Sequence, residues 1–390
     1  MIYKKNRPSE QQLKRINHLS NSLMSGVQKR SSSLRDLVAE IKYKEDVPDP
    51  EPTIVIDPAK INVIKLDSNK QRTTDVQYFD TSADASTYLR EAASTDRFDV
   101  LYGDDCTIST INLEYNTSSD SDHKAFEVIH ELYLGTGVKS ISRQAFQESS
   151  IEILRCAPNS VTTIYDSAFG GCASLSQLIL PTTSLMYIGD NAFSGTLSLT
   201  NISLPSCLQA LGNNCFYLPT NGWTITRTLT FGEDGHLSAI PNYAFANNKF
   251  DALTIPDYVQ AIGTGAFAMD IASATPEMYT GCVSLTIGDG VTTISANAFA
   301  QNRLMTTLTI GTSVTTIGSK AFEFLASLSS LTIPASVTTL ADDSFDGLGD
   351  SVIHDGGTVS VTINQAEDNI TSTNITAWKN SEYYTLTWTG

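Results

Sequence analysis

The chain lacks several features that would assign it quickly to a functional class. Its 390 residues contain no apolar run near the ~20 residues that a membrane-spanning helix needs. The amino-terminal residues 1–8 carry charge without an apolar segment after them, so we expect no secretory signal peptide. Six cysteines occur without a CxxC pair, and five histidines are scattered without metal-ligand spacing. We therefore expect reduced, buried thiols, and neither a metal site nor a cofactor.

Basic residues are scarce outside the first part of the chain. Residues 1–46 hold ten Lys and Arg against five Asp and Glu, a net charge of +5, whereas the whole chain carries −17. From residue 251 onward there are three basic and fourteen acidic residues. A nucleic-acid surface needs a basic face, so nucleic-acid binding is not expected in this acidic part. The basic segment favours contact with nucleic acid or an acidic protein surface, unless it is only a solvated helix.

What the chain has in abundance is a repeat marked by phenylalanine. Nine rings recur at spacings of 23, 24, 23, 29, 22, 32, 23 and 23 residues. Ile or Leu lies five residues before each ring, Val or Leu eight residues before it, and Ala, Cys or Ser directly before it. A period near 23 indicates a solenoid in which each unit packs only on its neighbours. The rings are Phe146, Phe169, Phe193, Phe216, Phe245, Phe267, Phe299, Phe322 and Phe345.

Each unit also holds an apolar–x–apolar triplet upstream of the ring, such as Leu-Thr-Ile at 253–255. The alternation predicts a short strand, and the Pro or Gly that follows in most units ends it. The segment from the Val to the Phe is expected to form a second short strand or extended turn, then one helical or 3₁₀ turn. The predicted fold is therefore an α+β repeat solenoid of nine units.

Segments such as SLTIPASVTTLADDSF at 330–345 and LTIPDYVQAIGTGAF at 253–267 carry the repeat most clearly, with GCASL at 171–175 as a link between units. These segments resemble the BspA-type (Treponema-type) leucine-rich repeat, over about residues 130–350. The resemblance implies a curved β-solenoid used for adhesion or protein binding, without catalytic residues. Bacterial members of that family are usually exported, and the missing signal in this sequence departs from the pattern.

The flanks of the repeats predict further segments around a solenoid at 130–350. Residues 1–46, with apolar residues at helical spacing, predict a helical attachment segment that docks on a partner or self-associates. Residues 47–52 form a stiff Pro-rich linker. Residues 53–129 predict a small α+β capping module, and residues 351–390 a β cap at the other end. Strands are expected at 53–56, 61–66, 75–79, 98–102, 108–115, 359–363 and 383–388, and a helix at 83–93.

Two features of the solenoid surface are candidate binding elements. The middle residue of each triplet is expected to face outward, in a row that includes Tyr133, Ile179 and Ser203. This row is either a hydroxyl platform for a protein or glycan or a consequence of the β-propensity of Thr. The two long spacings place insertions near 217–227 and 269–282, which bring Met269, Met278 and two aromatic residues to loops. The predicted binding residues are Trp223, Tyr279, Thr230, Thr254, Thr286, Thr309 and Thr332, although Trp223 packed on a neighbouring unit is equally consistent.

Together these features predict an elongated, non-enzymatic protein that displays its repeat surface on a larger assembly through residues 1–46. The partners expected are a protein of that assembly, a protein or glycan on the solenoid, and a second copy through the N-terminal helices. An unexported, adhesin-like solenoid favours a fibre or decoration component of a bacteriophage virion. The alternative is a bacterial or protist cell-surface adhesin exported by a non-classical route, otherwise a cytoplasmic protein. A third hypothesis is an enzyme with an unrecognised site in residues 53–126.

Overall fold

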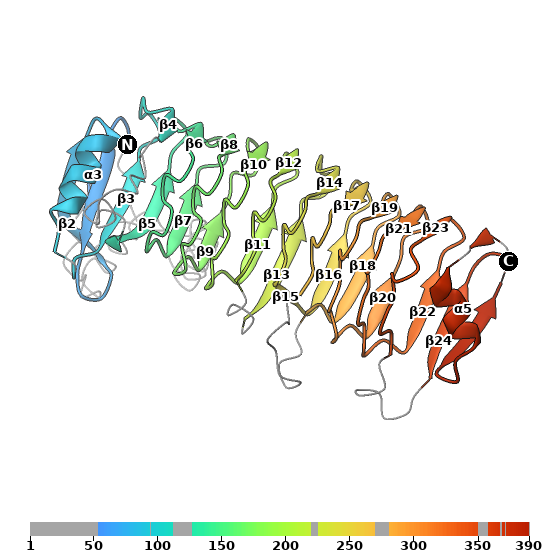
Figure 1. Cartoon of the computed structure of the whole chain (residues 1–390). Coiled ribbons are helices and arrows are strands. Elements are labelled where there is room, and N and C mark those ends of the chain that lie inside the picture. The colour runs from blue at the N-terminus through green and yellow to red at the C-terminus, as the bar shows by residue number, and fades with distance from the viewer. Residues whose placement is uncertain are drawn as a thin grey trace, which may run out of the picture.

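The computed structural model shows an elongated stack of repeated turns, with one helix near each end (Figure 1). Longer strands line one side of the stack, and two-residue strands line the opposite side. The predicted α+β repeat solenoid is thus confirmed. No helix among the described residues is long and apolar enough to cross a membrane. The structure describes residues 54–93, 95–111, 127–219, 225–269, 281–349, 358–366, 369–370 and 372–389, so residues 1–46 and the Pro-rich linker lie outside it.

The longer strands form where the apolar–x–apolar triplets were found. Apolar side chains point inward at every second position, as in the buried–exposed alternation of Leu253–Ile255, and neighbouring strands pair in parallel. The strands on this side are β3 (Phe98–Tyr102), β5 (Ile129–Leu134), β7 (Ile153–Cys156), β9 (Gln177–Ile179), β11 (Asn201–Leu204), β13 (Thr226–Phe231), β15 (Lys249–Phe250), β16 (Ala252–Ile255), β18 (Ser284–Ile287), β20 (Thr307–Thr309), β22 (Ser330–Ile333), β24 (Val359–Ile363) and β25 (Tyr384–Trp388).

The short strands contain the Ile or Leu that lies five residues before each ring. They also pair in parallel, in the orders β12-β10-β8-β6-β4 and β14-β17-β19-β21-β23. Turns follow them directly, so the expected second short strand is present and the ring is carried by a turn, not by a helix. These strands are β4 (Thr110–Ile111), β6 (Ser140–Ile141), β8 (Thr163–Ile164), β10 (Tyr187–Ile188), β12 (Ala210–Leu211), β14 (Ala239–Ile240), β17 (Ala261–Ile262), β19 (Thr293–Ile294), β21 (Thr316–Ile317) and β23 (Thr339–Leu340).

The nine repeat rings form one continuous stack through the core. Successive centroids lie 5.0–5.5 Å apart, with planes tilted by no more than 11°, and each ring is at most 2% exposed. The separation is close to the ~4.8 Å between paired strands, so the ring stack and the sheets rise together. Each unit therefore buries its ring only because a neighbour lies above or below it.

The turns that carry the rings are hydrogen-bonded to one another. The Phe193 N–H donates to the Cys215 carbonyl at 2.7 Å, and the Phe322 N–H donates to the Ser344 carbonyl at 2.8 Å. The same bond joins the other units, so each ring is tied to the small residue before the next ring. That small residue is buried in every unit, which leaves no room for a larger side chain. Left-handed backbone at Asn191, with φ of 56°, shapes the turn, and Asn tolerates this conformation well.

At the N-terminal end the sheet of the solenoid continues without a break. Its order is β2-β1-β3-β5-β7-β9, where β1 (Ile61–Leu66) and β2 (Arg72–Phe79) are antiparallel. The helix α3 (Ser82–Arg90) begins at the N-cap Thr81 and buries Ala85 and Leu89 against this sheet. The strand expected at 53–56 does not form at the described residues 54–56. Because β3 pairs with β5 as one repeat pairs with the next, the cap and the first repeats share a single sheet and core.

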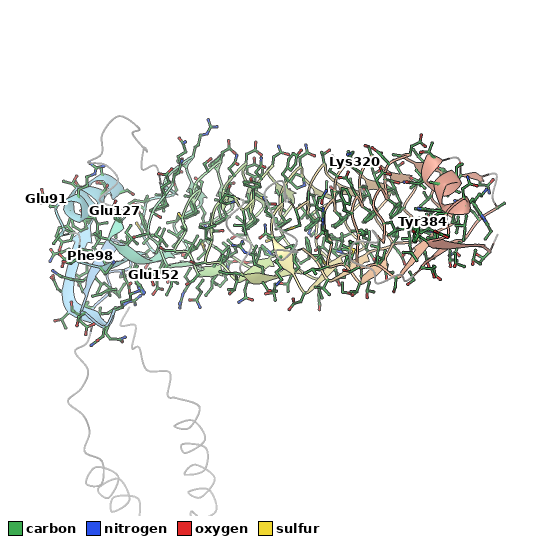
Figure 2. The ribbon with its side chains drawn as sticks, turned by 60° about the horizontal axis from the view of Figure 1, so that its bottom comes forward. Glu91, Phe98, Glu127, Glu152, Lys320 and Tyr384 are labelled. Atoms are coloured by element: carbon green, nitrogen blue, oxygen red, sulfur yellow. The ribbon has the colours of Figure 1, made fainter. Side chains whose placement is uncertain are left out.

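At the C-terminal end two further parallel strands and a helix complete the stack. β24 pairs with β22, and β25 pairs with β24, close to the strands expected there. The helix α5 (Thr373–Lys379), which the sequence pattern did not predict, places Trp378 edge-on against Phe345 at 5.9 Å. Tyr384 lies beside this helix, at the end of the molecule opposite to Phe98 (Figure 2). The last ring of the stack is thus covered by an indole instead of another phenylalanine.

Replacement of one ring in the stack should destabilise the whole array. We expect Phe322→Ala to lower the free energy of unfolding by ~3–5 kcal/mol, because a large buried side chain is lost between two stacked neighbours. Thermal unfolding followed by circular dichroism measures the change, with the exposed Thr309→Ala as the control. If the variant has the same melting temperature as the parent, the ring stack does not stabilise the array as proposed.

Ser344 offers the opposite test, because it occupies a position where seven units carry Ala. Its side chain is fully buried, and its hydroxyl has no hydrogen-bond partner. We expect Ser344→Ala to raise the free energy of unfolding by about 1 kcal/mol, since the unsatisfied polar group is removed. The matched control is Ser160→Ala, where a buried hydroxyl donates to the Ala157 carbonyl at 2.6 Å. In urea unfolding, the free energy of unfolding should rise for Ser344→Ala and fall for Ser160→Ala, relative to the parent.

Candidate functional site

The row of outward-facing residues predicted from the triplets is present on the longer strands. Thr254 pairs with Thr286, and Thr286 pairs with Thr309, so the three side chains stand in register on neighbouring strands. All five predicted threonines are exposed. The row continues beyond the nine repeats, because Thr332 pairs with Thr362 and Thr362 with Thr387. The geometry confirms the outward orientation, and ligand binding by these residues stays a prediction.

A second row of small polar residues runs beside the first. It lies two positions earlier in each strand, where Ser284 pairs with Thr307 and Ser330 pairs with Ser360. Ala252 interrupts it on β16. Two parallel lines of hydroxyl groups therefore cover the outer faces of β18 and β20 in one sheet and of β22, β24 and β25 in the next. They present donors and acceptors without charge.

The residues predicted for the two insertions are only partly in view. Trp223, Met278 and Tyr279 lie outside the described residues. Met269 was expected on a loop, and this is wrong, since it is 2% exposed and its N–H donates to the Ala300 carbonyl. Its backbone still belongs to the hydrogen-bonded turns of the stack. The described chain resumes just before β13 and β18, at the edge of the sheet where the parallel strands begin.

At the N-terminal end of the same outer face, charged side chains replace the hydroxyl groups. Asp99 on β3 is only 3% exposed. Its Oδ2 accepts a hydrogen bond from Arg72 Nε at 2.5 Å, and its Oδ1 lies 3.0 Å from His130 Nδ1. Arg72 also donates to Glu131 Oε2 at 3.0 Å. A buried carboxylate costs several kcal/mol unless it is paired, and Asp99 has the Arg72 guanidinium as an ion-pair partner and the His130 ring as a second polar partner. The first two strands of the solenoid thus hold a compact ionic cluster.

Two irregularities in strand pairing bring these residues together. The register between β3 and β5 shifts at Phe98 and Asp99, so that His130 is the extra residue on β5. The register between β1 and β2 shifts between Ile64 and Leu66, next to Arg72. A bulge re-aims a side chain that a regular strand would point elsewhere. One shift makes His130 the extra residue on β5, and the other lies next to Arg72, so both occur beside the two groups that contact Asp99.

Further charged groups surround this cluster. Arg155 on β7 lies 3.4 Å from Glu131, and Lys70 donates to both oxygens of Glu152 at 2.6 and 2.7 Å. Tyr133 donates its hydroxyl to Asp104 at 3.1 Å. Cations and carboxylates alternate across the surface, so most of their charge is compensated locally.

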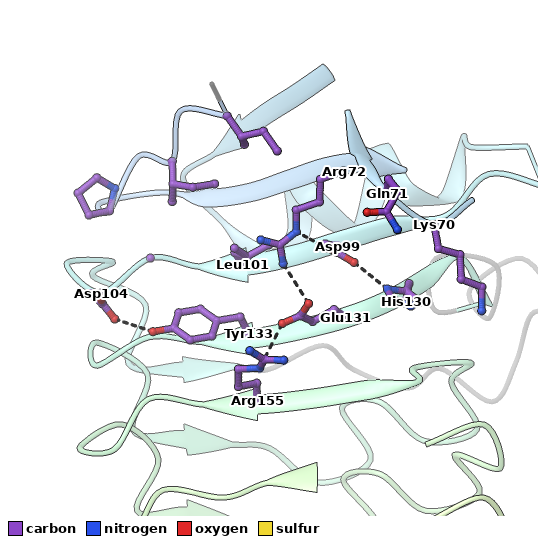
Figure 3. A pocket seen from close by; sticks show the side chains of 14 residues that line it. Lys70, Gln71, Arg72, Asp99, Leu101, Asp104, His130, Glu131, Tyr133 and Arg155 are labelled. Atoms are coloured by element: carbon purple, nitrogen blue, oxygen red, sulfur yellow. Dashed lines mark hydrogen bonds and ion pairs between the residues drawn. The ribbon is translucent and has the colours of Figure 1, made fainter. Parts of the chain in front are cut away.

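A cavity of about 470 Å³ opens over the cluster (Figure 3). Its floor is the outer face of β3, β5 and β7, and its opposite wall is made by residues 54–58 and 70–72. Ile54, Ile56, Pro58 and Leu101 give the cavity an apolar part, and charged side chains make up much of the remaining lining. The volume lies within the roughly 300–1,000 Å³ of small-molecule sites. Among the described residues that line it there is no serine, threonine or cysteine, and Tyr133 contributes a phenolic hydroxyl.

The signal for this cavity was present in the sequence but is weak. Arg155 occupies the outward row between Tyr133 and Ile179, where later units carry Ser or Thr. Asp99 and Glu131 hold the second outward position of their strands in the same way. A change from charged to hydroxyl residues along one row could have been noticed. The contacts of His130 and Arg72 with Asp99 could not be predicted from the sequence, because they depend on the register shifts.

The cysteines do not form a second site. No two of the six are joined by a disulfide, and all but the partly exposed Cys207 are buried. Burial raises the pKa of Cys156 and Cys282 to about 12 and that of Cys172 to about 11. Thiols of this kind are poor nucleophiles at neutral pH, so they act as small core side chains.

Comparison with known proteins places the repeats in a family. The sequence profile for the BspA type leucine rich repeat region matches residues 102–222, 139–271 and 238–352, in six copies. None of the curated proteins is a significant match.

Several solved structures are similar to the chain at low sequence identity. A leucine-rich repeat protein from Bacteroides ovatus is 18% identical, with 74% of this chain and 76% of that chain covered and a TM-score of 0.43. A leucine rich cell surface protein from Faecalibacterium prausnitzii is 16% identical, over 87% and 96%, with a TM-score of 0.35. The pneumococcal vaccine antigen PcpA is 17% identical, over 75% and 81%, with a TM-score of 0.34.

The profile matches run together from residue 102 to residue 352, which is more than half of the 390 residues. They cover all nine rings of the stack and the strands that pair around them. The chain therefore belongs to the family of BspA-type leucine-rich repeat proteins.

Proposed function

We propose that this chain is a non-enzymatic recognition protein whose binding surface is the outer face of the long-strand sheet. The observation that carries the proposal is the register of the outward residues. From β18 to β20 and from β22 to β25 they stay aligned on paired strands, so the face is regular over a long distance. A rigid, regular face loses little conformational entropy when it binds, which favours recognition of an extended target.

The two insertions are proposed to supply the strongest contacts. After each insertion the described chain resumes just before β13 or β18, which supports this proposal. Interfaces concentrate their binding energy in a few residues, and Trp and Tyr are the commonest of these. The hydroxyl rows then provide a surface that is complementary to the ligand and exclude water from the interface. Each of their residues contributes less binding energy than an aromatic anchor.

Residues 1–46 are proposed to attach the chain to a larger assembly. Their net charge of +5 contrasts with the acidic remainder, and a Pro-rich linker separates the two. A fibre or decoration component of a bacteriophage virion is the assembly that this arrangement favours. A cell-surface adhesin of a bacterium or protist is the alternative, since it needs the same binding face but a different anchor. Beads coated with the chain should then be retained by bacterial cells in the first case and by extracellular-matrix proteins in the second.

Substitution of the predicted anchors tests where the binding energy lies. We expect Trp223→Ala and Tyr279→Ala each to weaken retention of the beads by ~2 kcal/mol, which is roughly a thirtyfold loss of affinity. The melting temperature should stay close to that of the parent. Thr309→Ala is the control from the hydroxyl row and should change neither quantity.

Two results would contradict this assignment. If Trp223→Ala unfolds the protein, the indole belongs to the core and the insertion is not a recognition element. If Thr309→Ala weakens retention more than either aromatic substitution, the hydroxyl row is the principal site.

Deletion of residues 1–46 tests the anchor separately. We expect the truncated chain to lose only the helical contribution of residues 1–46 to its circular dichroism spectrum and to keep its melting temperature, because the repeats pack on one another. It should no longer co-sediment with the parent assembly, and it should lose self-association through the N-terminal segment. Full incorporation of the truncated chain would rule out the anchor.

A further inference from the structure

We infer that the cavity over β3, β5 and β7 is a carbohydrate site that takes the mono- or disaccharide end of a neutral glycan. The inference deepens the recognition function proposed above by giving one place on the outer face a ligand class. It depends on the residues that line the cavity and not on the hydroxyl rows or the insertions.

The first reason is that the floor of this cavity offers only side chains to a ligand. β3 pairs with β1 and β5, β5 pairs with β3 and β7, and β7 pairs with β5 and β9. All three strands of the floor are therefore interior strands whose backbone groups are already used. A peptide that binds by strand addition needs a free strand edge, which this floor does not offer. On this floor the ligand must satisfy its hydrogen bonds with side chains.

The second reason is charge. Arg72 is shared between Asp99 and Glu131, and Lys70 is held by Glu152. A charged ligand would have to break one of these pairs and leave its partner without compensation, which is costly for a group as buried as Asp99. The chain beyond residue 46 also carries a net −22, which opposes an anionic ligand. A neutral ligand avoids both costs.

The third reason is the mixture of donors, acceptors and apolar surface. A sugar hydroxyl both donates and accepts, so it is satisfied where carboxylates and guanidinium groups alternate, as Glu131 and Arg155 do. Arg155 lines the cavity with a side chain that is 44% exposed, so its guanidinium group is accessible to a ligand. Leu101 and the Tyr133 ring on the floor, with Ile54 and Ile56 opposite, supply apolar contact for the C–H face of a sugar ring.

The test uses the intact chain on an array of neutral and acidic oligosaccharides, followed by titration calorimetry with the best free sugar. Leu101→Trp fills the cavity without removing a charged group, and we expect it to abolish binding. Glu131→Gln keeps the shape of the side chain and should weaken binding at least tenfold. Arg155→Gln should weaken it at least fivefold, and it remains informative if the tryptophan variant does not fold, because its side chain is 44% exposed.

The matched control is Glu323→Gln at the other end of the solenoid. Glu323 pairs with Lys320 at 2.9 Å, and its side chain is 14% exposed, against 13% for Glu131. It loses an ion pair of similar burial, but it lines no part of the cavity. We expect the Glu323→Gln variant to bind the sugar with the same affinity as the parent.

Three outcomes would overturn the site. They are a wild-type chain that binds no oligosaccharide, one that binds only acidic oligosaccharides, and binding that survives both Leu101→Trp and Arg155→Gln. If bead retention persists in any of these cases, the recognition function stands and only the carbohydrate site is lost. If retention is lost in the anchor variants while the sugar still binds, the cavity is a separate site from the main face.

Discussion

The contact between one repeat turn and the next is the interaction on which the rest of this molecule depends. A phenylalanine ring lies on the ring of its neighbour, and the backbone N–H of the same residue donates to the carbonyl of the small residue that precedes the next ring. Apolar burial and a directional hydrogen bond thus act at the same step of the stack. Neither is available to a single isolated unit, so stability arises between neighbours and the fold is inherently elongated.

A stack of this kind must end, and the two ends are closed differently. The N–H groups of each ring-bearing turn point toward the following unit, so the two ends of the array are not equivalent. At the N-terminal end the sheet continues into an antiparallel pair, and α3 covers its inner face. At the C-terminal end Trp378 covers the last ring, and β25 is the final strand of its sheet. In both cases a helix replaces the missing neighbour.

The regular stack also explains why the outer face divides into two chemical regions. Once the inward residues are committed to the core, the outward positions are free to vary without loss of stability. Over most of the sheet they are Thr and Ser, which suit an exposed strand and carry no charge. Over β3, β5 and β7 they are Asp, Glu, Tyr and Arg, packed under an additional wall that only the N-terminal end possesses. The cavity is therefore a product of the cap and the first repeats together.

The sequence by itself determined the periodic part of this protein. The solenoid, the inward-facing triplets and the buried rings could be predicted from the period near 23 and from local spacing. This is possible because each repeat packs on neighbours of the same kind and therefore buries the same positions. The outward orientation of Thr286 and Thr309 followed in the same way from the alternation of a strand. The helix α5 did not follow, since seven residues without a strong apolar pattern form a helix here through the N-cap Ser372 and contact with Phe345. The meeting of Arg72, Asp99 and His130 was decided only by the tertiary structure, because two shifts in strand register bring together residues that are up to 58 positions apart in the chain.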